Sequence, residues 1–207
     1  MIYTTPCAFA FSLFCFLSFT WALYRHFESP GQMPHNMRAL SIFSLVAYVM
    51  FLAIGLLSDP GPWQVNGAIA LFIASAVIFW SAVNATRKGG LHVAHEDAVS
   101  REIVTRGPYR YLRHPFYVAY RLFWLATALI GGPVLWMFTL AFFIWYAILA
   151  REEEKRLLRS ELGSSYKAYL SKRGLFQSGG FKHAETGTHK TVHASILARA
   201  VATFRFR

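Results

Sequence analysis

The chain has 207 residues, of which 55% are hydrophobic and 17% aromatic, and its mean hydropathy is positive at +0.35. Ordinary soluble domains are less apolar, so this composition favours an integral membrane protein. The 21 Lys and Arg outnumber the 10 Asp and Glu and give a net charge of +11. These charges flank long uncharged runs, which indicates contact with anionic lipid headgroups and argues against nucleic acid as a partner.

Five apolar runs follow one another along the chain. A helix that crosses the hydrocarbon core needs ~20 mostly apolar residues, and each run approaches or reaches that length. We expect the first run to be a retained helix, because residues 1–6 carry no positive charge and no cleavage site of small residues follows it. The sequence therefore predicts an all-α fold, a polytopic membrane bundle of about five transmembrane helices. The runs are residues 7–23, 39–57, 65–85, 116–130 (which contains Arg121) and 133–150.

Gly131, Gly132 and Pro133 separate the last two runs. Glycine tolerates positive φ and proline cannot continue a preceding helix, so the triplet predicts a tight turn. The last two runs should then form a hairpin whose ends leave the membrane on the same side.

The placement of positive charge predicts the orientation of the bundle. Six of the Lys and Arg lie between Arg87 and Arg113 and twelve between Arg151 and Arg207, whereas residues 58–64 have none. Positive segments stay in the cytosol. We therefore expect a multi-pass membrane protein with its amino terminus outside and its carboxyl terminus in the cytosol.

The chain divides at Gln177-Ser178-Gly179-Gly180, where a polar, glycine-containing stretch follows the last predicted helix. We expect a transmembrane domain over residues 1–176 and a basic tail over residues 177–207. The tail has two open interpretations, since residues 195–204 have the apolar spacing of a short interfacial helix but a disordered tail fits equally well.

The segment before the hairpin, residues 106–117, packs three arginines, a histidine and three tyrosines into twelve residues. Gly107-Pro108 and His114-Pro115 fix turns at its two ends, because proline sets its own φ and keeps the preceding residue out of the helical region. An interfacial belt of Tyr and Arg is one interpretation. The other is a braced loop that holds polar side chains for binding.

The segment after the hairpin carries an acidic triplet, Glu152 to Glu154. Glu152 is spaced i,i+4 from Arg156, so the helix should continue out of the bilayer with a charged first turn. A solvated charged face would explain the triplet. The hairpin, however, brings it near the arginine-rich loop, and that arrangement predicts a mixed-charge pocket covered by tyrosines.

These two segments together resemble the isoprenylcysteine carboxyl methyltransferases and their relatives, including the phospholipid methyltransferases. The resemblance covers about residues 102–169, with Gly-Pro-Tyr-Arg-Tyr-x-Arg-His-Pro-x-Tyr at residues 107–117, then a glutamate pair, Leu158 and the Gly163, Tyr166, Tyr169 pattern. It implies a methyltransferase that uses S-adenosylmethionine in a cytosolic pocket and acts on a lipophilic acceptor. The residues it assigns to cofactor binding are Tyr109, Arg113, His114, Pro115, Tyr117, Glu153 and Glu154.

Three features depart from the family pattern, one of them the Gly174-Leu175-Phe176 stretch, which replaces the family's hydrophobic-proline ending. Ala119 stands where a glycine commonly follows the motif, so helix packing there should differ. An ungapped count from Gly163 places the glutamate pair on Glu154 and Lys155, whereas Glu153-Glu154 needs a one-residue insertion. Because Glu154 shares a helical face with Leu157 and Leu158, which we expect to pack inward, Glu154 should contribute most to binding and to catalysis, Glu153 less and Glu152 hardly at all.

Two arginines could meet the acceptor. Arg151, at the cytosolic end of the fifth run, is expected to act in catalysis by orienting an acceptor carboxylate, although an arginine that extends to the interface is equally common. Arg121 lies within the fourth run, where a charge costs ~2.5–3.5 kcal/mol at the centre. It should either reach for the interface or face the bundle and meet the acceptor's polar head.

The sequence leaves two other functions open. Membrane reductases of the sterol type, which use NADPH, share a similar carboxyl-terminal layout, and a non-catalytic membrane protein could keep the motif to bind lipid headgroups. The segment His92 to Glu96 has two histidines and a glutamate but no further ligands at a familiar spacing, so we assign no metal. Membrane lipids are expected partners, and the sequence does not indicate an oligomeric state.

Overall fold

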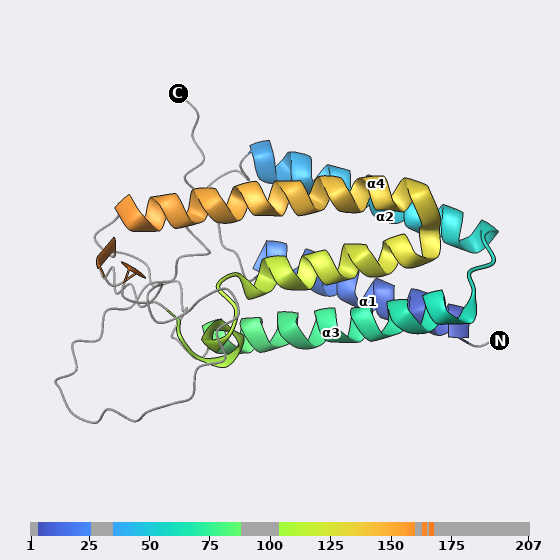
Figure 1. Ribbon diagram of the computed structural model, residues 1–207, viewed down its shortest axis with the longest axis horizontal. Coiled ribbons are helices and arrows are strands. Elements are labelled where there is room, and N and C mark those ends of the chain that lie inside the picture. Colours follow the sequence, from blue (N-terminus) through green and yellow to red (C-terminus); the bar gives the residue numbers. More distant parts are fainter. Residues whose placement is uncertain (1–3, 26–34, 88–103, 160–162, 165, 168–207) are drawn as a thin grey trace.

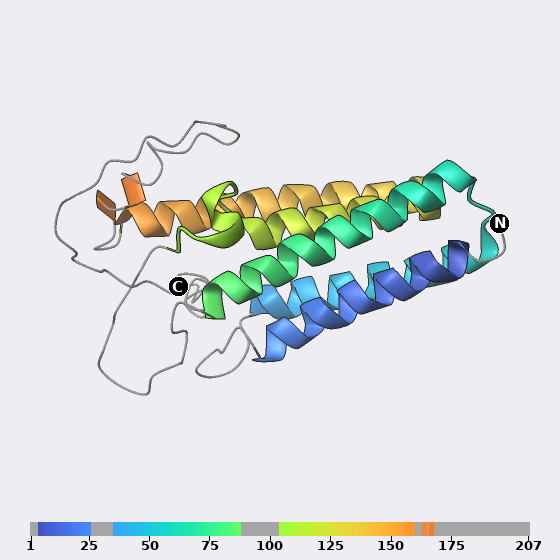
Figure 2. The same ribbon diagram turned by 90° about the horizontal axis from the view of Figure 1, so that it is seen from below.

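The structure, a computed structural model, describes residues 4–25, 35–87, 104–159, 163–164 and 166–167. The helices pack side by side along one long axis (Figures 1 and 2). The residues described within these ranges form no strand, and the all-α prediction is confirmed. The predicted tail, the break before it and the His92–Glu96 segment lie outside the described residues. The elements are α1 (Thr4–Arg25), α2 (His35–Leu57), α3 (Pro62–Arg87), the short 3-10 helix η1 (Gly107–Arg110) and α4 (Pro115–Arg159).

The four α-helices are each long and apolar enough to cross a membrane. Helix α4 has 45 residues, about 68 Å at 1.5 Å per residue, which is roughly twice the hydrocarbon thickness. It contains both the fourth and the fifth predicted runs and folds back on itself between them (Figure 1). The expected count of about five crossings therefore appears as four helices, the last of which is bent into a hairpin.

The hairpin turns at Gly132, whose backbone has φ 66° and ψ −155°. A β-carbon at this position would meet nothing within 4 Å, so space does not require the glycine. The backbone conformation does, because residues with a side chain rarely adopt it. The predicted turn at residues 131–133 is thus present, and it divides α4 into a first arm (residues 115–131) and a second arm (residues 133–159).

Aromatic side chains fill the centre of the bundle. Phe123, on the first arm, is fully buried and packs against rings from α1, α2 and α3. The same arm is tied to α3 by a hydrogen bond of 2.7 Å, in which the Ser75 hydroxyl donates to the Ala119 carbonyl. Ala119 itself is fully buried there. The alanine in place of the family's glycine is therefore small enough for this close contact between the helices.

The loop before α4 is anchored to the end of α3. Gly107 has φ 59°, and a β-carbon on it would come within 3.0 Å of the Ala85 β-carbon. The Arg106 Nε donates a hydrogen bond of 3.2 Å to the Ala85 carbonyl. The ring of Tyr109 is buried in an apolar cluster with Phe79 and other residues of α3 and α4. These contacts fix where the first arm begins, and with it the position of the residues before Pro115.

Candidate functional site

His114 stands at the point where the first arm begins. Pro115 occupies the first helical position, where its missing N–H costs nothing. The His114 carbonyl accepts the first hydrogen bond of the arm, 3.1 Å from the Val118 amide. The braced loop and the helix start together hold the His114 side chain toward the second arm.

Two carboxylates of the second arm meet the His114 ring, one at each nitrogen. The Nε2 atom lies 3.2 Å from Oε1 of Glu154, and the Nδ1 atom lies 3.4 Å from Oε2 of Glu153. The Arg113 guanidinium lies 3.6 Å from the same Glu154 oxygen. The structure therefore brings together four of the residues predicted for binding, from two segments 40 positions apart. We call Arg113, His114, Glu153 and Glu154 the polar cluster.

The two glutamates differ in burial. Glu153 is buried, with only 6% of its side chain exposed, whereas 27% of the Glu154 side chain is exposed. The next residue, Lys155, is exposed. This placement favours Glu153 and Glu154, rather than Glu154 and Lys155, as the pair that corresponds to the family's two glutamates.

The expectation for the leucines after the triplet is not met. Leu158 is 37% exposed, so its predicted inward packing is wrong, and the Leu157 side chain lies outside the described residues. The reason is the helical phase: the face that turns toward the first arm is centred on Glu153, two turns after the buried Tyr146. The observed helical phase therefore does not favour Glu154 over Glu153.

Aromatic rings line the membrane side of the polar cluster. Tyr117 stacks on the His114 ring at 5.5 Å between centroids and on the Tyr146 ring at 5.8 Å. Its hydroxyl lies close to the Glu153 carboxylate. The Trp124 indole N–H donates a hydrogen bond of 3.3 Å to the Tyr146 hydroxyl. Sequence reasoning missed Tyr146, although its seven-residue spacing from Glu153 places both on one helical face.

Charge in the polar cluster favours a protonated histidine. Burial on its own lowers the pKa of His114, but hydrogen bonding and attraction from Glu153 and Glu154 outweigh it and raise the pKa above its usual value. The imidazolium then balances the two carboxylates, with Arg113 as a second positive charge.

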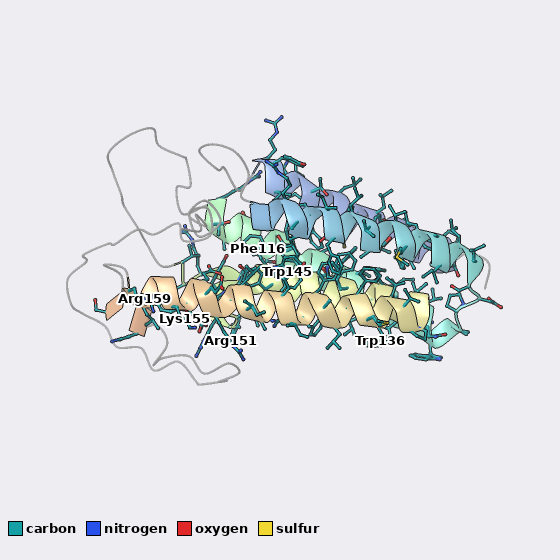
Figure 3. All side chains as sticks on the ribbon, turned by 90° about the horizontal axis from the view of Figure 1, so that it is seen from above. Phe116, Trp136, Trp145, Arg151, Lys155 and Arg159 are labelled. Atoms are coloured by element: carbon teal, nitrogen blue, oxygen red, sulfur yellow. The ribbon has the colours of Figure 1, made fainter. Side chains whose placement is uncertain are left out.

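Two of the predicted site residues lie apart from this cluster. Tyr109 packs in the apolar cluster near the end of α3. Arg151 is exposed, and Figure 3 shows it, like Lys155 and Arg159, on the side of the second arm turned away from the other helices. The structure does not bring Arg151 together with the polar cluster, and its role in orienting an acceptor stays a prediction.

The short described segment after α4 carries Gly163 and Tyr166, both buried. A β-carbon on Gly163 would come within 2.5 Å of the Leu158 carbonyl oxygen. Backbone cannot move aside as a flexible side chain can, so only glycine fits this close approach. The spacing of Gly163 and Tyr166 in the sequence motif thus has a packing reason. Tyr169, its third member, lies outside the described residues.

The polar cluster has the chemistry to hold a zwitterionic cofactor such as S-adenosylmethionine. The Oε2 atom of Glu153 is buried, and among the described residues it has the 3.4 Å ion-pair contact with His114 Nδ1 but no hydrogen bond of good geometry. A buried carboxylate oxygen in this state is costly until a donor reaches it, and an ammonium or hydroxyl group would supply one. Arg113 supplies a fork of donors that matches a carboxylate.

Comparison with known proteins identifies the family. No curated protein and no solved structure matches the chain. Residues 63–165 match the family described as phospholipid methyltransferase. The matched segment spans α3, the braced loop and the whole hairpin, and so contains the entire polar cluster. The chain belongs, through this segment, to the phospholipid methyltransferase family of membrane methyltransferases.

Proposed function

We propose that this membrane methyltransferase uses S-adenosylmethionine and transfers its methyl group to a lipophilic acceptor, in the manner of the isoprenylcysteine carboxyl methyltransferases. The observation that carries the proposal is the contact of His114 with both Glu153 and Glu154 across the hairpin. The resemblance assigns all three residues to the cofactor, and they meet within the segment that matches the family.

Different residues of the polar cluster would contact different groups of the cofactor. Glu153 would accept hydrogen bonds from its amino group or ribose hydroxyls, and Arg113 would bind its carboxylate. His114 holds both glutamates in place through its two ring nitrogens. Glu154 steadies His114 and Arg113 together, because it contacts both. Pro115 contributes by fixing the backbone at His114, and Tyr117 by covering the membrane side of the ring.

When bound, S-adenosylmethionine supplies a methyl group already activated on a sulfonium, so the protein has no leaving group to activate. Its tasks are to align donor and acceptor and to exclude water. The rings of Tyr117 and Tyr146, stacked in succession beneath the His114 ring, form an aromatic boundary between the polar cluster and the membrane part of the hairpin. An acceptor that partitions into the bilayer would approach from that side.

The orientation with the cluster in the cytosol is part of the proposal. The segments that carry most of the positive charge adjoin the end of the bundle that holds the cluster, and positive segments remain on the cytosolic side. A polar cofactor made in the cytosol then reaches the cluster without crossing the membrane.

Titration calorimetry on the purified protein in detergent tests the cofactor. We expect S-adenosylmethionine to bind and NADPH not to bind, and we expect His114→Ala and Arg113→Ala to abolish S-adenosylmethionine binding while the protein remains folded and monodisperse. Binding of NADPH alone would support a reductase of the sterol type. Lipid binding without binding of either cofactor would support a non-catalytic protein. Either of these two results would contradict the proposal.

A further inference from the structure

Arg121 is a charged residue inside the membrane part of the first arm. It follows His114 by seven residues, so the two side chains lie on one face of the arm about two turns apart. Tyr117 lies between them on the same face. Arg121 is therefore below the polar cluster, on the side from which a lipophilic acceptor would approach.

The contacts of Arg121 hold its position but do not balance its charge. One terminal nitrogen donates to the Phe143 carbonyl on the second arm at 3.5 Å, and the guanidinium carbon lies 5.6 Å from the centre of the Phe143 ring. The Nε atom is buried and has no hydrogen-bond partner among the described residues. A single long hydrogen bond leaves most of the donors of this guanidinium available.

No described carboxylate lies near enough to pair with this arginine. The acidic residues in the described ranges are Asp59, between α2 and α3, and Glu152 to Glu154. None of them lies within 4 Å of Arg121. A guanidinium in a membrane segment without an anion is unfavourable, and such residues commonly mark a substrate path.

The direction of the side chain indicates where an anion would sit. Side chains of a helix tilt toward its N-terminus, and the first arm starts at the polar cluster. The contacts with Phe143 show that Arg121 faces the second arm. The guanidinium therefore lies against the second arm at Phe143, in the neighbourhood of Tyr146.

We infer that Arg121 binds an oxyanion, a phosphate or a carboxylate, on the lipophilic acceptor and so positions the acceptor beneath the methyl donor. This inference rests on the proposed function, because it takes the polar cluster as the donor site. It makes Arg121 a determinant of acceptor specificity: anionic or zwitterionic amphiphiles are selected, and neutral ones of equal chain length are not.

Binding of simple amphiphiles to the purified full-length protein, measured by native mass spectrometry, tests the inference. The probes are dodecyl phosphate, dodecanoate and the neutral dodecanol. We expect Arg121→Gln to weaken dodecyl phosphate or dodecanoate binding by about tenfold or more, as the loss of a charge-assisted hydrogen bond implies, and to leave dodecanol binding unchanged. Arg121→Lys, which keeps the charge without the fork, should restore part of the affinity. Arg38→Gln, at an exposed arginine of α2, is the matched control.

A second measurement tests whether the anion binds where the acceptor binds. Dodecyl phosphate should inhibit transfer of labelled methyl groups from S-adenosylmethionine into a membrane lipid extract in the wild type and in Arg38→Gln, whereas Arg121→Gln should lower the transfer rate itself. If dodecyl phosphate bound without inhibiting transfer, Arg121 would bind a peripheral lipid instead of the acceptor. If Arg121→Gln bound dodecyl phosphate as tightly as the wild type, Arg121 would only extend to the membrane interface. Either result would overturn the inference. Absence of S-adenosylmethionine binding in the wild type would instead count against the proposed function, while the probe affinities would still report on Arg121.

Discussion

Replacing Glu153 by glutamine should weaken S-adenosylmethionine binding more than either neighbouring substitution. Glu153 is the buried member of the triplet, and among the described residues its Oε2 atom has the ion-pair contact with His114 Nδ1 but no hydrogen bond of good geometry. Glutamine keeps the shape but removes the negative charge and places an amide where the cofactor needs an acceptor. A hydrogen bond to a charged group contributes about 1.5–3 kcal/mol, so the dissociation constant should rise by about 10- to 150-fold.

Substitution of either neighbouring glutamate should raise the dissociation constant for S-adenosylmethionine less. Glu154 contacts His114 and Arg113, but more than a quarter of its side chain is exposed to screening by water. A loss of about 0.5–1.5 kcal/mol corresponds to an increase of about 2- to 12-fold in the dissociation constant. Glu152 is spaced for a surface pair worth about 0.3–0.5 kcal/mol, so Glu152→Gln should change the constant by about twofold or less.

Isothermal titration of the three purified variants decides the order. Glu153→Asp, which keeps the charge, should recover part of the affinity, and unchanged elution from a sizing column excludes misfolding. Binding by Glu153→Gln within twofold of the wild type would refute the assignment of the buried carboxylate. If Glu154→Gln were the most damaging, the order expected from sequence would hold after all, and a dominant effect of Glu152→Gln would reject the helical phase itself.

The remaining predictions concern pH and orientation. Because the pKa of His114 is raised in the fold, the stability from its protonated form is complete below the ordinary pKa of about 6.5 and is lost as the pH rises through the raised value. Between pH ~6.5 and the raised pKa of His114, the melting temperature of the wild type in detergent should therefore fall more steeply than that of His114→Asn. Parallel plots of melting temperature against pH for the two proteins would contradict this account. For orientation, Ser164→Cys in a chain with Cys7→Ala and Cys15→Ala should react with an impermeant maleimide only after cells are permeabilised; Ser164 is exposed, so labelling of intact cells would place the polar cluster outside.

The helices could be predicted from sequence because hydrocarbon imposes a simple length rule. Each apolar run lies within a helix of the structure, and Gly132 adopts the positive φ that the Gly-Gly-Pro triplet indicated. The hairpin in turn predicted that His114 and the acidic triplet would meet. These features depend on chain length, charge and backbone geometry, which a single sequence displays directly.

The choice among the glutamates could not be predicted in the same way. Glu152, Glu153 and Glu154 carry the same charge, and only the rotation of the second arm decides which of them faces His114. The prediction in favour of Glu154 assumed that Leu158 packs inward, but Leu158 is exposed, because apolar residues near a membrane surface need not face the protein. Tyr146 was missed for a related reason, since nothing in an uncharged run distinguishes an aromatic residue beside a site from one facing lipid.

The hairpin turn at Gly132 has a consequence for how the protein can diversify. Because the 45-residue helix α4 doubles back at this turn, Arg113 and His114, which immediately precede it, lie beside Glu153 and Glu154 near its far end. Neither α1 nor α2 supplies a residue to the cluster. Exchange of those two helices can therefore reshape the route by which an acceptor arrives while the donor-facing side chains stay in register, so one cofactor unit can serve many acceptors.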